Sequence, residues 1–501
     1  MSEPRAEERR GPSTALGSRV IRGSAWMLAM RWSVRLVGIV NTAVLARLLT
    51  PEDFGVVAMA GMVIAILMVF DDVGLELCIV RQPNLTHAHL DTAWTVRIAL
   101  SLVIALLIAG AAPLTARFFA EPRLVPVMLA LALAPVIGGL WNVSVMMYLR
   151  DLNYAKDFEI NVVVRVLSAV VGITVAVMLR NYWALVAAML IQPVIKVVAS
   201  YAYHPYRPRL SLAAIHDIWS FSAWMFLRNL ANWAAGRIDQ FLVGRMVGAS
   251  GLGGYFVASQ IAGMVVMETV LPLGRALIPG YANLLNDKAR LAQALVTVAG
   301  VTAIIAVPFG FGLAAVAEDF VLLLLGPKWT AAAPLLQVFA VAAAAAGIMS
   351  PAGAFTTATG KLRLMTLIMW AMAAAIAVAI AAAAGTGDPR WIAIARAGVV
   401  IVFVPVVYGL VLVPECPSPG RLVGGVLRPL LAGVAMVAVV RALHLGSVAN
   451  PAITLPIDVL TGAVTYPVAL LGIWWVSGRP VGGEGELIAR LRPLLRRAVR
   501  G

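Results

Sequence analysis

Apolar runs of about the length that crosses a bilayer recur along nearly the whole chain, and they leave few folds open. A transmembrane helix needs about 20 mostly apolar residues, because the hydrocarbon core is about 30 Å thick. We predict an all-α polytopic membrane protein with about 14 transmembrane helices, at Arg22–Leu49, Phe54–Val73, Thr92–Ala112, Leu124–Leu149, Ile160–Leu179, Trp183–Tyr203, Ile218–Val247, Gly254–Leu273, Leu291–Ala314, Pro334–Thr357, Leu364–Ala384, Ile392–Leu412, Val423–Leu443 and Leu455–Val476.

The composition excludes a large soluble protein. The chain is 61% hydrophobic and 13% charged, with a mean hydropathy of +0.91. One core could not bury that much apolar surface, and no stretch is long and polar enough for a soluble domain. The basic N-terminus, Met1 to Arg22, lacks the pattern of a cleaved signal peptide, so the first span is expected to insert uncleaved.

The loop charges orient the predicted helices. With the N-terminus in the cytoplasm, 21 lysines and arginines fall in cytoplasmic loops and termini and 6 fall on the other side. This is the positive-inside distribution, and it places both termini in the cytoplasm. The net charge of +15 is therefore explained by topology, and we expect no nucleic-acid partner.

An internal repeat divides the chain. The segment Ser24 to Gly61 matches the segment 198 residues later at 8 of 38 positions, beginning with SAWM in both copies. Six predicted spans separate the copies, so both halves enter the membrane in the same direction. Parallel repeats of this kind build many transporters, with substrate bound where the halves meet.

The repeat and the loops set the expected domain boundaries. Two six-helix lobes are followed by two extra C-terminal helices that lie outside the repeat. The segments are a cytoplasmic basic N-terminus at 1–21, an N-lobe at 22–203, a cytoplasmic linker at 204–217, a C-lobe at 218–412, two further helices at 423–476, and a cytoplasmic basic tail at 477–501. The pattern of the tail is compatible either with an amphipathic helix that lies on anionic membrane lipids or with a solvated segment.

Charged side chains within the predicted spans are the candidate functional residues. Such groups are costly in a bilayer, and they usually face a partner or a water-filled cavity. Arginine outnumbers acid here, which predicts a cationic cavity for an anionic substrate such as a diphosphate. The candidate substrate-binding residues are Arg31, Arg35, Arg97, Arg165, Arg228 and Arg237, the candidate ion-coupling acids are Asp239 and Glu268, and Arg396 is a further arginine at membrane depth.

Each of these residues also has a structural interpretation. Arg97 and Arg165 could lie near helix ends and extend to the lipid headgroups. Asp239 could pair with Arg237 or Arg245 inside its own lobe. The repeat places Asn41 opposite Asp239, so the scaffold is duplicated but the charges are not.

The chain lacks the motifs of enzymes and of metal or nucleotide sites. It has no phosphate-binding G-x-x-x-x-G-K-[ST] loop, and its loops are too short for the paired acids of a membrane glycosyltransferase. Cys78 and Cys416 form no disulfide or ligand framework, and His87 and His89 have no third ligand in view. We therefore expect no catalysis, no cofactor and no metal site.

Five stretches of the sequence carry a recognisable pattern. They are RGSAWMLAMRWSVRLVGIVNTAVLARLLTPEDFGVVAMA, RIDQFLVGRMVGASGLGGYFVASQIAG, LPLGRALIPGYANLLNDKARL, LLLLGPKWTAAAPLLQVFA and TATGKLRL. In order and spacing they resemble the Wzx-type polysaccharide flippases, which belong to the multidrug/oligosaccharidyl-lipid/polysaccharide (MOP) exporter superfamily. The resemblance is closest to the branch that exports colanic-acid-like or succinoglycan-like polysaccharide.

The resemblance implies a flippase of the bacterial inner membrane. Its substrate would be an undecaprenyl-diphosphate-linked oligosaccharide repeat unit, moved by alternating access and coupled to a proton or sodium gradient. Its partners would be the polysaccharide polymerase and the export machinery. Two alternatives stay open: an exporter of lipid II or small molecules from the same superfamily, and a membrane scaffold that transports nothing.

Overall fold

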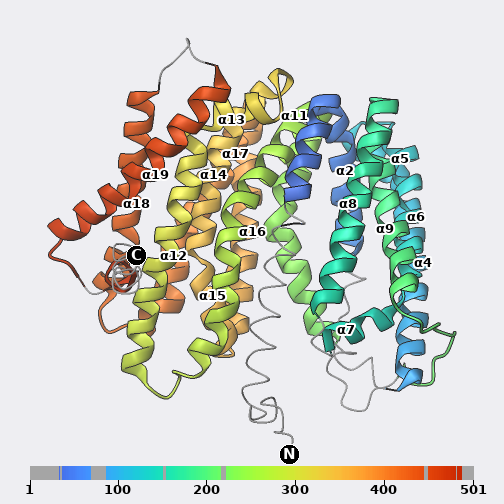
Figure 1. The fold of residues 1–501 in the computed structure, drawn as a ribbon, viewed down its shortest axis with the longest axis horizontal. Helices are drawn as coiled ribbons and strands as arrows, with labels where there is room; N and C mark the ends of the chain where they lie inside the picture. Colours follow the sequence, from blue (N-terminus) through green and yellow to red (C-terminus); the bar gives the residue numbers. More distant parts are fainter. Residues whose placement is uncertain are drawn as a thin grey trace, which may run out of the picture. The chain divides into compact units, whose positions relative to one another are not determined.

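The computed structural model describes residues 33, 36–68, 86–150, 154–215, 222–444, 450–480 and 482–487, and most of them are helical (Figure 1). Within these ranges, ten helices are long and apolar enough to cross a membrane. Large apolar side chains stay exposed along them, with Leu106 at 73%, Met178 at 77% and Val468 at 66%. An apolar outer surface suits lipid rather than water. The prediction of an all-α polytopic membrane protein is confirmed.

The chain forms two compact units, Met1–Trp233 and Ala234–Gly501, and the division falls within helix α11 (Ser222–Ala282). The sequence predicts the division slightly earlier, in the linker at 204–217. The lobe and linker boundaries given above remain predictions.

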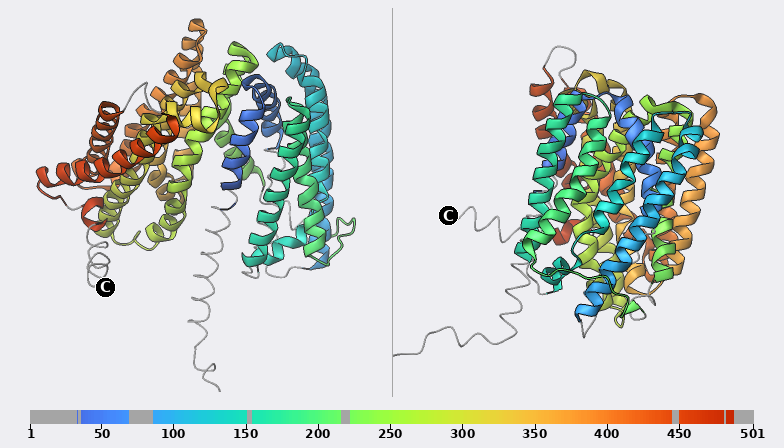
Figure 2. Two further views of the ribbon diagram at one scale, coloured as in Figure 1. Left: turned by 45° about the horizontal axis from the view of Figure 1, so that its top comes forward. Right: turned by 90° about the vertical axis from the view of Figure 1, so that its right-hand side faces the viewer.

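The first unit is a bundle of membrane helices. Helix α8 packs against α9, and α4 packs against α5 and α6 (Figure 2). The short α7 lies across the end of α8 in Figure 1. The described helices of this unit are Leu36–Leu48, α2 (Pro51–Leu67), α4 (His87–Phe119), α5 (Leu124–Leu131), α6 (Leu133–Gly139), η2 (Val143–Val145), α7 (Met146–Arg150), α8 (Tyr154–Leu179) and α9 (Trp183–Tyr203).

The fourth predicted span, Leu124–Leu149, is interrupted rather than continuous. It breaks between α5 and α6 at Ala132, three residues before Pro135. A proline has no N–H and cannot complete the helical hydrogen bond to the carbonyl four residues earlier, which explains the break. Further on, the Asn142 side chain accepts a hydrogen bond from the Ser144 N–H and donates one to the Tyr206 carbonyl at 2.8 Å.

Residues 204–215, the described part of the predicted linker, are fixed to the start of α4. The Tyr206 hydroxyl donates to Asp91 at 2.7 Å, and the Arg209 N–H donates to the same carboxylate oxygen at 2.8 Å. The Tyr206 ring stacks on His87 with centroids 5.0 Å apart. Burial, followed by the neighbouring carboxylate, raises the pKa of Tyr206 to about 12. This part of the segment is therefore an ordered connection.

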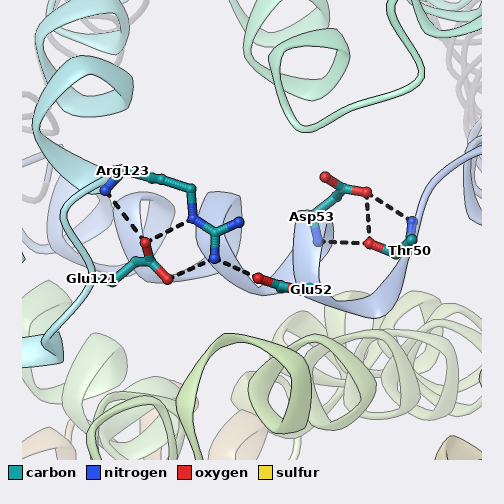
Figure 3. A network of polar contacts seen from close by, with 5 residues as sticks. All are labelled: Thr50, Glu52, Asp53, Glu121 and Arg123. Carbon is teal, nitrogen blue, oxygen red and sulfur yellow. Dashed lines mark hydrogen bonds and ion pairs between the residues drawn. The ribbon is translucent and has the colours of Figure 1, made fainter.

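A polar network ties the start of α2 to the turn before α5 (Figure 3). Arg123 donates to Glu52 at 2.6 Å and to Glu121 at 2.7 Å. These hydrogen bonds lower the pKa of Glu121 and raise that of Arg123. Beside them, Thr50 and Asp53 form a capping box, in which each side chain bonds the backbone N–H of the other.

The second unit is built around α12. This helix packs against α14 on one side and α18 on another, and α18 packs against α19 (Figure 1). Besides α11, its described helices are α12 (Lys288–Ala315), α13 (Ala317–Leu324), η3 (Pro327–Ala332), α14 (Ala333–Ile348), α15 (Ser350–Ala358), α16 (Leu362–Ala383), η4 (Ala384–Thr386), α17 (Pro389–Val407), the π-helical turn η5 (Tyr408–Leu412), η6 (Val413–Glu415), α18 (Pro419–Leu443) and α19 (Pro451–Val476).

Two predicted spans join through one residue in α11. Gly248 has φ 72° and ψ −173°, which is non-helical, and helical residues continue on both sides of it. Glycine adopts this positive φ at little cost, because it has no Cβ. The kink separates the predicted spans Ile218–Val247 and Gly254–Leu273 without a polar loop.

The start of the basic tail folds back onto the second unit. Glu484 is 2% exposed and accepts two hydrogen bonds from Arg428 of α18, at 2.7 and 3.1 Å. Gly483 approaches Gly300 of α12 so closely that a Cβ added at Gly483 would lie 2.6 Å from the Val301 nitrogen. Residues 488–501, where the amphipathic face is predicted, lie outside the described ranges.

Candidate functional site

Asp239 is the most deeply buried of the candidate residues that the structure describes. It lies on α11, and the residue is 1% exposed. The Tyr255 hydroxyl, also on α11 but beyond the Gly248 kink, donates to Asp239 Oδ2 at 2.9 Å. Tyr255 is fully buried as well. The kink therefore lets two parts of one helix turn their polar side chains toward each other.

The charge partner of Asp239 is Arg396. Its Nε lies 2.8 Å from Asp239 Oδ2, and it reaches across from α17. The guanidinium also lies over the Phe339 ring, 5.4 Å from its centroid, and Tyr255 meets the same ring edge-on at 4.7 Å. The interpretation that Asp239 pairs with Arg237 or Arg245 is wrong: the partner comes from another helix.

The ion pair between Asp239 and Arg396 leaves the second carboxylate oxygen of Asp239 without a partner among the described residues. That oxygen, Oδ1, is buried. Burying two ions costs several kcal/mol each, which their attraction offsets only when the remaining polar atoms are also satisfied. An unused carboxylate oxygen beside an ion pair is an acceptor that a proton or a small cation can occupy.

Two cations of the first unit meet on one tryptophan. Arg97 lies over the Trp141 ring at 4.9 Å, and Lys196 lies over the same ring at 4.5 Å. Trp141 is 3% exposed, so its ring is a buried platform for both charges. Arg97 lies five residues into the predicted span Thr92–Ala112, two residues beyond Thr95, whose hydroxyl accepts a hydrogen bond from the Ser211 N–H of the linker.

Arg165 lies near the middle of α8 and contacts a different partner. One of its terminal nitrogens would lie 2.9 Å from a Cβ added at Gly38, so the end of this side chain packs closely against that glycine. Arg165 Nε is buried and has no hydrogen-bond partner in the described part of the chain. Its central place in the helix favours an interior role over extension to the headgroups.

The remaining candidates are not all visible in the structure. Arg31 and Arg35 lie outside the described residues, and the side chains of Arg228 and Glu268 are not described. Arg237 is half-buried on α11. Lys196 was not among the predicted site residues, although its position inside the predicted span Trp183–Tyr203 could have indicated it.

Comparison with known families decides the assignment. A family described as polysaccharide biosynthesis protein matches residues 44–334, which is more than half of the chain. The chain belongs to this polysaccharide biosynthesis protein family. The match covers the Asp239–Tyr255 pair and the Trp141 platform, so both lie within the part that defines membership.

Curated relatives of this family member carry transport and biosynthesis names. It is 28% identical over 475 residues to the succinoglycan biosynthesis transport protein ExoT of Rhizobium meliloti (strain 1021), covering 91% of this chain and 94% of the relative. It is 25% identical to the lipopolysaccharide biosynthesis protein WzxC of Escherichia coli (strain K12), covering 70% of this chain and 72% of the relative. The resemblance to Wzx-type polysaccharide flippases is confirmed.

Two solved transporter structures share the fold. The lipid II flippase MurJ in an inward closed conformation matches with a TM-score of 0.71 over 91% of this chain and all of that chain, at 12% identity. An inward-facing multidrug resistance MATE transporter of the MOP superfamily matches with a TM-score of 0.54 over 78% of this chain and 95% of that chain, at 14% identity. These likenesses show the fold alone.

Proposed function

We propose that the protein moves a lipid-linked oligosaccharide repeat unit across the bacterial inner membrane by alternating access. The observation that carries this proposal is family membership over residues 44–334, together with full-length similarity to a relative named as a succinoglycan transport protein. The substrate would be a polyprenyl-diphosphate carrier bearing the sugars, and the polymerase and export machinery would take it onward. No catalytic chemistry is needed for this step.

The arginines and the lysine at membrane depth support an anionic substrate. Arg97, Lys196 and Arg165 place three cations on helices of the first unit, where bare charge is costly. A diphosphate offers several acceptor oxygens, which arginine binds with paired N–H groups. A scaffold that transports nothing would gain no benefit from these charges.

The test of the substrate site uses two arginines of the first predicted span. We expect the double substitution Arg31→Ala/Arg35→Ala to abolish polymer output in a host whose own copy is deleted, because the diphosphate loses two cations. The matched control is Arg117→Ala/Arg390→Ala, which removes two exposed arginines and should leave output unchanged. Normal output from the first variant, at equal abundance in the membrane, would refute this assignment.

We further propose that Asp239 couples transport to an ion gradient. Its free Oδ1 is the acceptor, and Arg396 and Tyr255 hold the other oxygen in place. In proteoliposomes, Asp239→Asn should remove the dependence of lipid-linked oligosaccharide movement on the proton or sodium gradient. If an ionophore slows the variant as much as it slows the native protein, Asp239 is not the coupling group.

A second candidate function is transport of lipid II, which is suggested by the similarity of the fold to that of a lipid II flippase. The sequence relatives favour the first function, because they are named for succinoglycan and lipopolysaccharide biosynthesis. If this protein restores growth to cells depleted of their own lipid II flippase, that result would favour the lipid II function.

A further inference from the structure

Three side chains of metal-binding type meet in the second unit, away from the candidate site. Asp319 lies in the first turn of α13, His444 directly follows α18, and Asp458 lies on α19. One ligand atom from each lies within 4.8 Å of the others. The sequence did not predict a ligand-binding role for any of these three residues, because they are far apart along the chain.

The fold holds these side chains together through specific contacts. His444 Nδ1 lies 2.7 Å from Asp458 Oδ2, and the Thr454 hydroxyl donates to Asp319 Oδ2. Thr454 and Asp458 are four residues apart on α19 and thus share a face. Both are nearly fully buried, at 3% and 4% exposed. Helices α13 and α18 both pack against α19, so the cluster joins three elements (Figure 1).

A small cavity opens beside the cluster. Its volume is about 40 Å³, and its lining includes Asp319, His444, Glu318 and Arg441. A water molecule needs only about 10–15 Å³ measured in this way, so an ion and its remaining waters have room. Arg441 opposes a cation here, but the carboxylates of Asp319, Asp458 and Glu318 outnumber it.

The donor set discriminates among cations. One imidazole nitrogen with two carboxylate oxygens suits a divalent first-row transition metal, whereas Mg²⁺ and Ca²⁺ prefer oxygen alone. Zn²⁺ binds these atoms at about 2.0–2.2 Å in tetrahedral geometry, so the ligand atoms of one ion lie about 3.4 Å apart. The separations of up to 4.8 Å therefore require side-chain shifts of about 1 Å on binding. Binding would replace the hydrogen bond between His444 and Asp458 with two metal bonds.

We propose that Asp319, His444 and Asp458 form a binding site for a divalent transition-metal ion that ties α13, α18 and α19 together. The site is separate from the Asp239–Arg396 pair and does not depend on which substrate the protein transports. The predicted topology places it at the periplasmic ends of these helices, where extracytoplasmic metal ions would reach it.

The test measures Zn²⁺ binding to the full-length protein, purified in detergent without a histidine tag and stripped with a chelator. We expect one Zn²⁺ per chain by elemental analysis after gel filtration, and a rise in the thermal unfolding temperature when Zn²⁺ is added. His444→Gln and Asp458→Asn should each weaken binding at least tenfold. His89→Gln, which removes a half-buried histidine of the first unit, is the matched control and should bind as the native protein does.

The Zn²⁺-binding results of the two histidine variants either support or overturn the proposed site. Loss of the stoichiometric ion in His444→Gln but not in His89→Gln supports the site. Absence of saturable binding, or equal binding by native protein and His444→Gln, overturns it. Equal affinity for Ca²⁺ or Mg²⁺ overturns the transition-metal assignment. Because His444 is partly exposed, with 38% of its side chain accessible, its variant should fold even if Asp458→Asn does not.

Discussion

Replacing Arg396 with leucine is expected to lower the free energy of unfolding by about 3–5 kcal/mol, the range observed when one partner of a buried ion pair is removed. The substitution leaves Asp239 as a carboxylate that is 1% exposed, and among the described residues only the Tyr255 hydroxyl then compensates it. It also removes the guanidinium from the Phe339 ring. The measurement is unfolding of the purified protein by titration of SDS into detergent micelles.

Two further variants show whether charge is the cause. Arg390→Leu removes an exposed arginine at the start of the same helix, α17, and should change the free energy of unfolding by no more than about 0.5 kcal/mol. The double variant Asp239→Asn/Arg396→Leu should recover much of the loss, because no uncompensated ion remains. If Arg396→Leu and Arg390→Leu unfold alike, Arg396 does not stabilise the second unit through Asp239.

Gly310→Ala is expected to destabilise the second unit by about 1–3 kcal/mol, although alanine is normally the better helix former. A Cβ at Gly310 would lie 2.6 Å from the Ala340 carbonyl oxygen and 2.6 Å from the Ala344 Cβ. Both atoms belong to α14, and the oxygen is backbone, so the helices themselves must separate. Membrane helices use small residues for such close approaches, because lipid gives them no hydrophobic driving force to associate.

The same helix provides the control. A Cβ at Gly312 would meet only the end of the Met436 side chain, at 3.7 Å, which is ordinary contact. Gly312→Ala should therefore be neutral or raise the free energy of unfolding by up to about 1 kcal/mol. A loss of stability in Gly310→Ala without a loss in Gly312→Ala, measured in the same SDS titration, confirms the close packing of α12 and α14. Equal effects would contradict it.

Much of the fold was predictable because hydropathy acts locally. Each predicted span is mostly helical wherever the chain is described, since an apolar run in lipid can satisfy its backbone only as a helix. The interruption of Leu124–Leu149 was not predicted, although Pro135 was a local signal for it. The direct continuation through Gly248 was missed because glycine alone does not specify a kink.

The candidate site was predictable in its residue types but not in its pairings. The sequence predicted that the charged residues Asp239 and Arg396 lie at membrane depth. For Asp239 it offered only nearby Arg237 and Arg245 as charge partners, because periodicity along one helix says nothing about which other helix packs against it. Lys196 was passed over, and the Trp141 platform that joins it to Arg97 exists only once α4, α9 and the chain between them are packed.

The sequence by itself determined the membrane class, the helical segments and the excess of cations within the apolar segments, all of which depend on local hydropathy and on charge counts. Only the tertiary structure decided that Asp239 pairs with Arg396 and leaves Oδ1 free, and that Asp319, His444 and Asp458 meet. The reason is physical: the energy of a buried charge depends on atoms within a few ångströms, and helix packing brings those atoms from distant parts of the chain.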